Sequence, residues 1–309
     1  MRSLLKSSLL IAFVAILTLG WTTAAVAQTG GQQQERTPVY DEKTDANAQI
    51  AAAMAKAKKE NKQVMVQWGA NWCGWCVKLH DTFKQDRKVA TMLNNEYETV
   101  FIDVGRFDKH IDVAEKWGAK FKGIPHLTVL DGQGGIIANL NTGILEEGGG
   151  HDPAKVLSFL ELCKAKPLDA NKVYEKALAQ AKTEGKLVFL HIGAPWCGWC
   201  KKLEAFIARP EIDAIISKDY VHVKIDQDRM TGGKEFAAKI REGKQGGIPW
   251  FAYLDADGKT LATSDGPDGN VGFPVQPNEI AHWLDMFKET AKKITSMELG
   301  TIKQELEKK

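Results

Sequence analysis

One phrase with two cysteines occurs twice in this 309-residue chain. Residues 71–79 read "NWCGWCVKL", and 124 positions later residues 195–203 read "PWCGWCKKL". At the same offset, segments 55–80 and 179–204 are identical at 15 of 26 positions, and "GIPHLTVLDG" aligns with "GIPWFAYLDA". A period of this length corresponds to a whole domain rather than to a solenoid repeat. The chain is therefore expected to fold as two domains of one kind.

Each copy has the pattern of an α/β domain, in which apolar runs of strand length alternate with segments of helical periodicity. The expected strands are 63–69 and 99–104 in the first copy and 187–193 and 221–226 in the second, with a further strand after each Gly-Ile-Pro. The expected helices are 45–60, 111–120 and 153–164, then 170–184, 233–241 and 277–292, and helical spacing also follows the cysteines. This order predicts a central mixed β-sheet flanked by helices in each domain.

The domains are expected at 45–165 and 167–292. A polar segment at 28–44 is predicted to be a flexible linker because it has too little apolar surface to pack. Residues 293–309 are expected to form a charged, loosely docked helical tail.

The first 27 residues have the pattern of a secretory signal peptide. Arg2 and Lys6 form a positive start, an apolar run spans 9–19, and Ala25-Val26-Ala27 matches a small-x-small cleavage site. The alternative is an uncleaved membrane anchor, but the run is shorter than the roughly 20 residues that span a bilayer. A periplasmic or secreted protein is therefore expected, in a compartment where disulfides persist.

The charge balance gives no sign of a nucleic-acid partner. The formal net charge is +2, and without Arg2 and Lys6 the 39 remaining basic residues equal the 39 acidic ones. Such a balance does not suggest a basic surface for nucleic acid or for a membrane. No nucleic-acid partner is expected.

The paired cysteines have the spacing of a redox reagent. If Cys73 begins a helix, the unpaired backbone N–H groups and the helix dipole favour its thiolate. Cys76 then lies one turn inward on the same face. Cys73 can attack a foreign disulfide and Cys76 can resolve the mixed disulfide, and Cys197 and Cys200 repeat these roles. A shared zinc site is the alternative, but each pair lies in its own copy.

"WCGWC" followed by "GIP" resembles the thioredoxin superfamily, and the duplication resembles two tandem thioredoxin-like domains covering nearly all of the chain after residue 44. The first cysteine precedes the proline by 52 positions in both copies. The resemblance implies that Pro125 and Pro249 are cis and, with Ile124 and Ile248, bind an extended substrate segment. It also implies thiol–disulfide exchange with protein partners, without an organic cofactor or metal.

Two features depart from the thioredoxin pattern. The buried carboxylate usual six residues before the first cysteine is replaced by Gln67 and by His191. Gln67 cannot titrate, whereas His191 is a candidate for proton transfer or for a cation near the thiolates, with a neutral, hydrogen-bonded core histidine as the alternative. Gly-Trp stands between the cysteines where thioredoxin has Gly-Pro, and this dipeptide influences the redox potential.

Several residues near the cysteines can either pack in the core or face a substrate. Trp72 and Trp196 are expected to pack beside the disulfides, while Trp75 and Trp199 are expected to be exposed and to offer apolar contact area to a substrate. His126 and Trp250, which follow the prolines, are expected either to shape the surface at the site or to pack in a strand. The loop 263–277 has no equally long counterpart in the first copy and either shapes substrate entry or is a surface insertion. Cys163 is expected to be a half-buried helix residue, with intermolecular pairing as the alternative.

The sequence thus predicts an exported thiol–disulfide oxidoreductase. Reduction of partner disulfides is the leading direction because Gly-Ile-Pro resembles the reducing branch of the superfamily. A reductase in an oxidising compartment needs a membrane or soluble electron donor. Disulfide oxidation or isomerisation is the first alternative, and a thioredoxin fold that binds partners without catalysis is the second.

Overall fold

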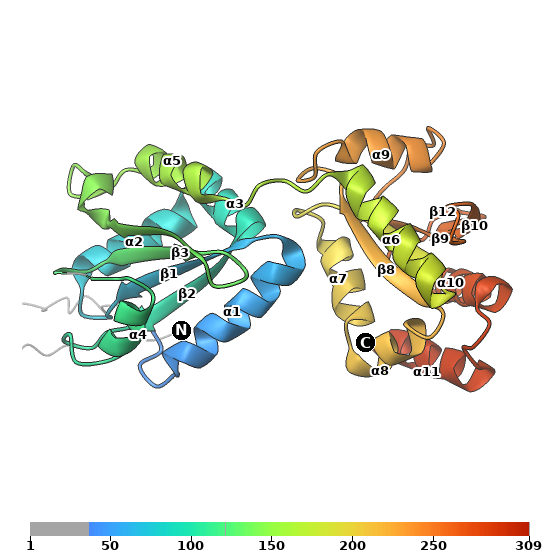
Figure 1. Ribbon diagram of the computed structural model, residues 1–309, viewed down its shortest axis with the longest axis horizontal. Helices are drawn as coiled ribbons and strands as arrows, with labels where there is room; N and C mark the ends of the chain where they lie inside the picture. Colours follow the sequence, from blue (N-terminus) through green and yellow to red (C-terminus); the bar gives the residue numbers. More distant parts are fainter. Residues whose placement is uncertain (1–36, 121, 309) are drawn as a thin grey trace, which may run out of the picture. The chain divides into compact units, whose positions relative to one another are not determined.

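The computed structural model describes residues 37–120 and 122–308, so the expected signal peptide lies outside the described residues. No helix within these ranges is both long and apolar enough to cross a membrane. Two four-stranded sheets carry the fold, with strand orders β2-β1-β3-β4 and β8-β7-β9-β10 (Figure 1). Each is a mixed sheet flanked by helices, which confirms the predicted α/β class.

The first sheet is built around a central strand that is buried along its whole length. This strand, β1 (Gln63–Gly69), pairs in parallel with β2 (Tyr97–Asp103) and antiparallel with β3 (His126–Leu130), and β4 (Ile136–Asn141) pairs antiparallel with β3. A strand buried on both faces reads as an apolar run without alternation, as "QVMVQWG" does.

Successive residues of β1 supply two separate cores. Val64, Val66 and Trp68 pack against α1 (Ala46–Glu60) and α4 (Ile111–Lys116). Met65 points the other way, toward α2 (Gly74–Gln85), α3 (Arg87–Glu96) and α5 (Pro153–Cys163). Figure 1 shows α1 and α4 on one side of the sheet and α2 and α5 on the other.

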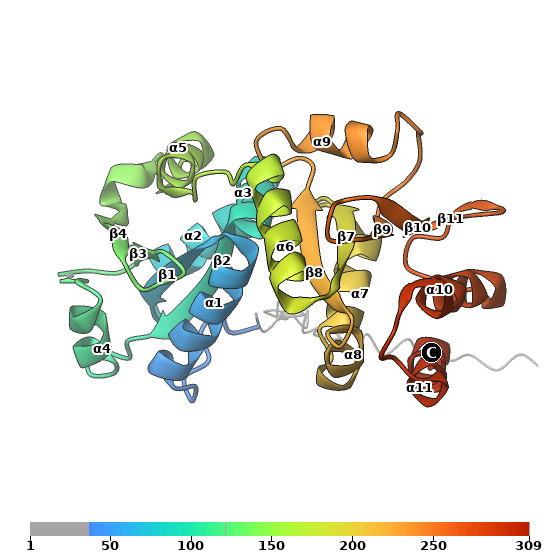
Figure 2. The same cartoon turned by 45° about the vertical axis from the view of Figure 1, so that its right-hand side comes forward.

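The second sheet repeats this plan with a larger core on one face. β7 (Leu187–Gly193) pairs in parallel with β8 (Tyr220–Asp226) and antiparallel with β9 (Trp250–Leu254), which pairs with β10 (Thr260–Thr263). One face packs against α6 (Ala170–Glu184) and α9 (Gly233–Ile240), which Figure 2 shows in front of and above the strands. The other face packs against α7 (Gly198–Ile207), α8 (Pro210–Ile216) and α10 (Pro277–Thr290).

The expected helices and strands are present within a few residues of their predicted ends, but short elements were missed. These are α3 and α8, a 3-10 turn at Thr142–Leu145, and two ribbons, β5 (Glu146–Glu147) with β6 (Gly150–His151) and β11 (Asp265–Gly266) with β12 (Gly269–Asn270). Both ribbons follow the last strand of a sheet. The first ribbon folds onto α2, whereas the second is hydrogen-bonded to the segment before β9.

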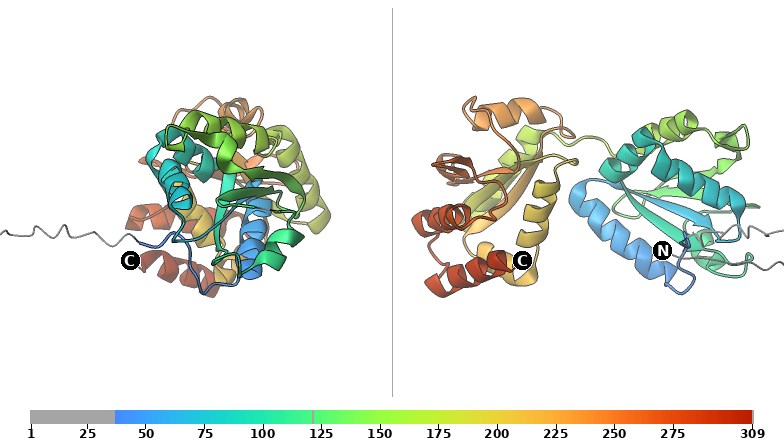
Figure 3. Two further views of the ribbon diagram at one scale, coloured as in Figure 1. Left: turned by 90° about the vertical axis from the view of Figure 1, so that its left-hand side faces the viewer. Right: turned by 180° about the vertical axis from the view of Figure 1, so that it is seen from behind.

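The two ends of the described chain are more firmly packed than the sequence suggested. Tyr40, in the expected flexible segment 28–44, is 1% exposed. The tail forms α11 (Ser296–Glu307), red beside α10 in Figure 3, and buries Leu299 and Ile302 in the core of the second domain. The loose docking expected for the tail is therefore wrong, since two apolar side chains per three turns give α11 a buried face.

Candidate active sites

Both cysteine pairs are disulfide-bonded, and each lies where a central strand gives way to a helix. Cys73 is the N-cap residue of α2, and Cys197 is the N-cap residue of α7. The backbone N–H of Cys76 donates to Cys73 Sγ over 3.1 Å, and that of Cys200 donates to Cys197 Sγ over 3.0 Å. A helix N-terminus stabilises negative charge, so a thiolate at either first cysteine is favoured.

The Gly-Ile-Pro segments lie against the first cysteine of each pair. Both Ile-Pro peptide bonds are cis, as the family resemblance implied. The carbonyl oxygen of Ile124 is 3.6 Å from Cys73 Sγ, and that of Ile248 is 3.5 Å from Cys197 Sγ. The two isoleucines are half-buried while the prolines are buried. Each site therefore combines a disulfide with a half-exposed backbone edge.

The tryptophans differ from expectation. Trp72 and Trp196 are exposed, at 51% and 67%, because their indole N–H groups bond outward to the Gly105 carbonyl oxygen and to Asp228. The prediction that they pack beside the disulfides is wrong.

The tryptophans between the cysteines, Trp75 and Trp199, differ in exposure. Trp75 is half-buried, with its ring edge-on to His151 at 5.6 Å. Trp199 is 49% exposed, as expected. His126 and Trp250, which follow the prolines, are buried strand residues, so the packing role holds for both.

In the first domain a tyrosine reaches the disulfide from the N-terminal segment. Gln67 is fully buried, and its amide donates to the Tyr40 hydroxyl over 2.5 Å and to the Cys76 carbonyl oxygen over 3.1 Å. A Cβ added to Gly69 would lie 2.1 Å from that hydroxyl and 3.0 Å from Cys76 Sγ. Burial raises the pKa of Tyr40 far above its usual value. Cys76 therefore has a neutral phenol beside it.

In the second domain a carboxylate takes this place. A Cβ added to Gly193 would lie 3.4 Å from Cys200 Sγ and 3.8 Å from Glu204 Oε1. Glu204 also contacts Lys224 Nζ at 2.7 Å and His191 Nε2 at 3.3 Å. Burial opposes the charge of Glu204, but the hydrogen bond from His191 and the positive charge of Lys224 prevail and lower its pKa to about 2. Glu204 is ionised at neutral pH.

His191 is the middle member of a chain of three side chains. Its Nδ1 lies 2.8 Å from His222 Nε2 and its Nε2 faces Glu204, so both ring nitrogens are engaged. The two imidazole planes are nearly parallel, 7° apart with centroids separated by 4.9 Å, and His222 is exposed. Complete burial lowers the pKa of His191. The lowered pKa and the two engaged nitrogens favour a neutral, hydrogen-bonded core histidine over a cation near the thiolates.

Cys163 lies apart from both pairs. It is buried at the end of α5 in the core between the first sheet and α2, and burial raises the pKa of its thiol. Because Cys163 is buried, it fits the packing role better than the role of an intermolecular disulfide partner. Within the described ranges, no group of three or more His, Cys, Asp or Glu side chains is arranged to hold a metal ion.

Three residues at these sites were missed: Tyr40, Glu204 and His222. Glu204 had a signal, because its spacing of four residues from Cys200 places both on one face of a helix. His222 had a weaker one in strand alternation with Lys224. Tyr40 had none, since it lies in a polar segment 33 residues before Cys73.

The fold and site geometry define a protein with two thioredoxin-like domains. A family model described as thioredoxin-like matches residues 45–132 and 169–256, more than half of the chain. The chain belongs to this thioredoxin-like family.

Several known proteins are similar to the chain. Protein disulfide-isomerase tigA of Aspergillus niger is 27% identical over 204 residues, which are 63% of this chain and 52% of the relative. Disulfide bond reductase DsbH of Chlamydia pneumoniae is 26% identical over 157 residues, 48% of this chain and 91% of the relative. The chain thus spans about half the length of the fungal protein.

Among solved structures, a disulphide isomerase from Xylella fastidiosa Temecula1 is 28% identical. The match covers 40% of this chain and 95% of that one, with a TM-score of 0.38.

Proposed function

We propose that the protein is an exported thiol–disulfide oxidoreductase that exchanges disulfides with protein partners at two sites. The observation that carries the proposal is the position of each disulfide, with its first sulfur at a helix N-terminus and within 3.6 Å of the carbonyl oxygen before a cis-proline. The names of the relatives from Aspergillus niger and Chlamydia pneumoniae support the same reaction class. Export rests on the pattern of residues 1–27.

The proposed roles follow from exposure and order. Cys73 and Cys197 are the nucleophiles, because their residues retain 6% and 4% exposure while Cys76 and Cys200 have none. A thiolate at the first cysteine attacks a partner disulfide, forms a mixed disulfide and expels the partner's second sulfur as a thiolate, which takes a proton from solvent. The second cysteine then loses its proton, attacks the first cysteine's sulfur and releases the other partner thiolate. Two electrons pass to the partner, and the site is left as a disulfide.

The backbone and side chains around the nucleophile are proposed to hold the substrate. Ile124 with Pro125, and Ile248 with Pro249, place a carbonyl group where an extended segment of the partner can pair with it. Trp199 adds exposed apolar area beside Cys197, and Trp75 adds a half-buried counterpart in the first domain. The domain limits 45–165 and 167–292 belong to the same proposal.

We propose that His191 takes part in proton transfer from Cys200 indirectly, through the carboxylate of Glu204. Both ring nitrogens of His191 are engaged, so the imidazole acts on Cys200 only through the carboxylate. Glu204, His191 and His222 form a hydrogen-bonded path from the side of Cys200 to an exposed imidazole. The proton released when Cys200 attacks can follow this path to solvent.

Reduction of partner disulfides is the proposed direction, with a membrane or soluble protein as electron donor. The resemblance of Gly-Ile-Pro to the reducing branch and the reductase name of the chlamydial relative support it. Isomerisation is the second candidate, supported by the name of the fungal relative and by the tandem sites.

Trapping experiments test the exchange chemistry. With Cys76→Ser or Cys200→Ser, a disulfide-containing protein substrate should accumulate as a mixed disulfide with Cys73 or Cys197, because the resolving thiol is missing. The double variant Cys73→Ser/Cys197→Ser should form none and should lose disulfide exchange. If the double variant still binds the partner and neither Cys76→Ser nor Cys200→Ser traps a mixed disulfide, the protein is a binding module and not an enzyme.

A further inference from the structure

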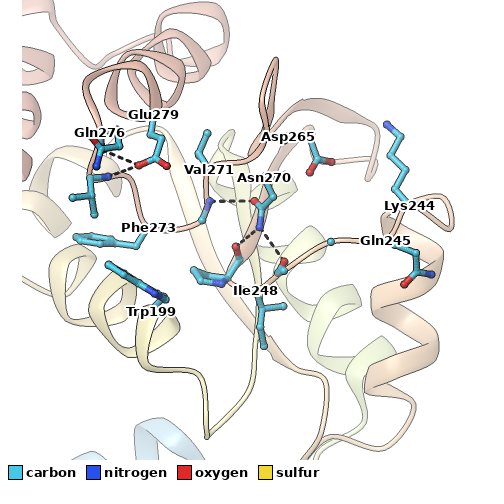
Figure 4. Close-up of a pocket in the computed structure, with 16 residues that line it drawn as sticks. Trp199, Lys244, Gln245, Ile248, Asp265, Asn270, Val271, Phe273, Gln276 and Glu279 are labelled. Atoms are coloured by element: carbon cyan, nitrogen blue, oxygen red, sulfur yellow. Dashed lines mark hydrogen bonds between the residues drawn. The ribbon is translucent and has the colours of Figure 1, made fainter.

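A pocket of about 910 Å³ opens beside the disulfide of the second domain (Figure 4). It lies between the start of α7, the segment that leads to the cis-proline, and the loop after β10. Its apolar lining residues are Trp199, Ile248, Pro249, Val271, Phe273 and Val275. A concave apolar surface with exposed aromatic groups is the usual form of a binding site rather than of an ordinary protein surface.

An aromatic pair forms one wall of the pocket. Trp199 and Phe273 are stacked, with ring centroids 6.4 Å apart and planes inclined by 27°. Phe273 is supported from behind by Phe206, whose ring centroid is 5.9 Å away. Trp199 is 49% exposed and Val275 is 43% exposed. The wall therefore presents apolar area that the described residues leave open to solvent.

The opposite wall is fixed by hydrogen bonds rather than by loose loop contacts. Figure 4 shows the Asn270 amide donating to the carbonyl oxygens of Gly247 and Pro249, both over 2.9 Å. Ser264 donates to Asn270 Oδ1 over 2.8 Å, and the Trp250 indole donates to Asp265 over 3.0 Å. The ribbon of β11 and β12 is thus attached to the segment that contacts the nucleophile. The pocket is formed before any ligand binds.

The pocket is continuous with the position of the reacting sulfur. Ile248 lines the pocket, and its carbonyl oxygen lies 3.5 Å from Cys197 Sγ. An extended chain advances about 3.3 Å per residue. A partner disulfide held at Cys197 therefore places the side chains one or two residues from the partner's cysteine at the mouth of the pocket.

The first domain has a different surface at its disulfide. There the ribbon of β5 and β6 folds onto α2, where Lys78 Nζ donates to the Gly149 carbonyl oxygen over 2.7 Å and Trp75 packs edge-on against His151. Trp75, which corresponds to Trp199, is therefore partly covered by the chain itself.

We propose that the pocket of the second domain binds a large apolar side chain, aromatic or branched aliphatic, next to the reacting cysteine of an extended partner polypeptide. The second site then prefers disulfides flanked by such residues, and the first site does not. The inference rests on the proposed oxidoreductase function and specifies the substrate class of one of its two sites.

The test uses two peptides that contain the same internal disulfide and differ at one position beside a cysteine, tryptophan in one and alanine in the other. Each is reduced by the full chain in two forms, Cys73→Ser/Cys76→Ser and Cys197→Ser/Cys200→Ser, which leave one site each. A dithiol supplies the two electrons of each turnover, and its uncatalysed rate is subtracted. At the second site kcat/KM should be about tenfold or more higher for the tryptophan peptide, since burying a large apolar group discriminates on this scale. At the first site the ratio should be near one.

Pocket variants in the form that keeps the second site complete the test. Val275→Ser and Phe273→Ala should lower the ratio toward one, because the rate for the tryptophan peptide should fall more than the rate for the alanine peptide. Leu261→Ser is the matched control, because Leu261 is 41% exposed in the same domain and does not line the pocket. Equal rates for both peptides at the unaltered second site would contradict the binding of an apolar side chain in the pocket. The proposed oxidoreductase function would stand. If neither peptide is reduced at either site, the proposed function fails and the pocket's substrate role falls with it.

Discussion

Glu204 lies beside Cys200 in the second domain, where Tyr40 lies beside Cys76 in the first. One is a carboxylate held ionised by His191 and Lys224, and the other is a phenol held neutral by burial. The same CGWC motif thus has a carboxylate beside it at one site and a phenol beside it at the other. A fixed negative charge disfavours a nearby thiolate, so the two sites differ in how well they stabilise the reduced state.

Glu204→Gln should make the second site less reducing. Loss of the negative charge stabilises the thiolates of the reduced form, so the reduction potential of Cys197–Cys200 should rise by about 20 to 40 mV, equivalent to about 1 to 2 kcal/mol. Equilibrium titration against a glutathione buffer measures the shift.

The matched control for this change is His80→Gln, because His80 occupies the equivalent position in the first domain. Burial lowers the pKa of His80, so this side chain is neutral and its replacement should leave the potential of Cys73–Cys76 within a few millivolts. Equal shifts in the two variants would contradict the role given to the Glu204 charge.

An added methyl group should distinguish the two domains. Gly69→Ala places a Cβ 2.1 Å from the Tyr40 hydroxyl, so the tyrosine must move, and the free energy of unfolding should fall by about 1 to 3 kcal/mol. Gly193→Ala is the control, since the nearest atoms lie 3.4 Å from its Cβ, and the loss should stay below about 1 kcal/mol. Urea denaturation followed by tryptophan fluorescence measures both, and similar losses would show that Tyr40 does not fill this space.

Tyr40→Phe tests whether the N-terminal segment is part of the first site. The change removes the acceptor of the buried Gln67 amide, so it should destabilise the first domain by about 1 to 3 kcal/mol. The thiol of Cys76 should also react with iodoacetamide at a changed rate in the reduced protein. The alkylation rate of Cys200 serves as the internal control. If neither the free energy of unfolding nor the alkylation rate of Cys76 changes, Tyr40 is not part of the first site.

His151 should make the first domain sensitive to acid. It is 5% exposed, and burial lowers its pKa to about 4 from the ordinary value of 6.5. Because the unfolded chain binds the proton more readily, the stability contribution is complete above pH 6.5 and is lost as the pH falls toward 4. The free energy of unfolding should drop by about 1 to 3 kcal/mol over this range.

His151→Gln should reduce that drop, because glutamine does not titrate. Thermal unfolding at pH 7, 5.5 and 4 compares the two proteins. The same dependence on pH in both would assign the acid sensitivity to other groups, among them His191, whose pKa burial also lowers.

The sequence predicted what depends on local pattern. The duplicated motif with its fixed spacing to Gly-Ile-Pro indicated both domains and the paired cysteines at helix starts, and the resemblance to the thioredoxin superfamily implied both cis-prolines. Strand 63–69 was recognisable because a strand buried on both faces must be apolar throughout. These features are repeated within each copy and need no knowledge of distant contacts.

The surroundings of the sulfurs depend on tertiary contacts that the motif does not contain. Tyr40 reaches Cys76 from a polar segment whose composition suggested disorder. Trp72 and Trp196 were placed wrongly because their indole N–H groups bond to Gly105 and Asp228 on other loops, which keeps the rings outside. The pocket at Phe273 arises from a ribbon too short to recognise by periodicity.

An equilibrium redox titration of each CGWC pair, with the other pair changed to serine, tests whether both sites are reversible and reducing. We expect reversible two-electron titration at both sites with potentials near that of thioredoxin, about −270 mV. Potentials above about −180 mV would contradict the reducing direction and favour oxidation or isomerisation, and a pair that does not titrate reversibly would contradict the enzyme itself.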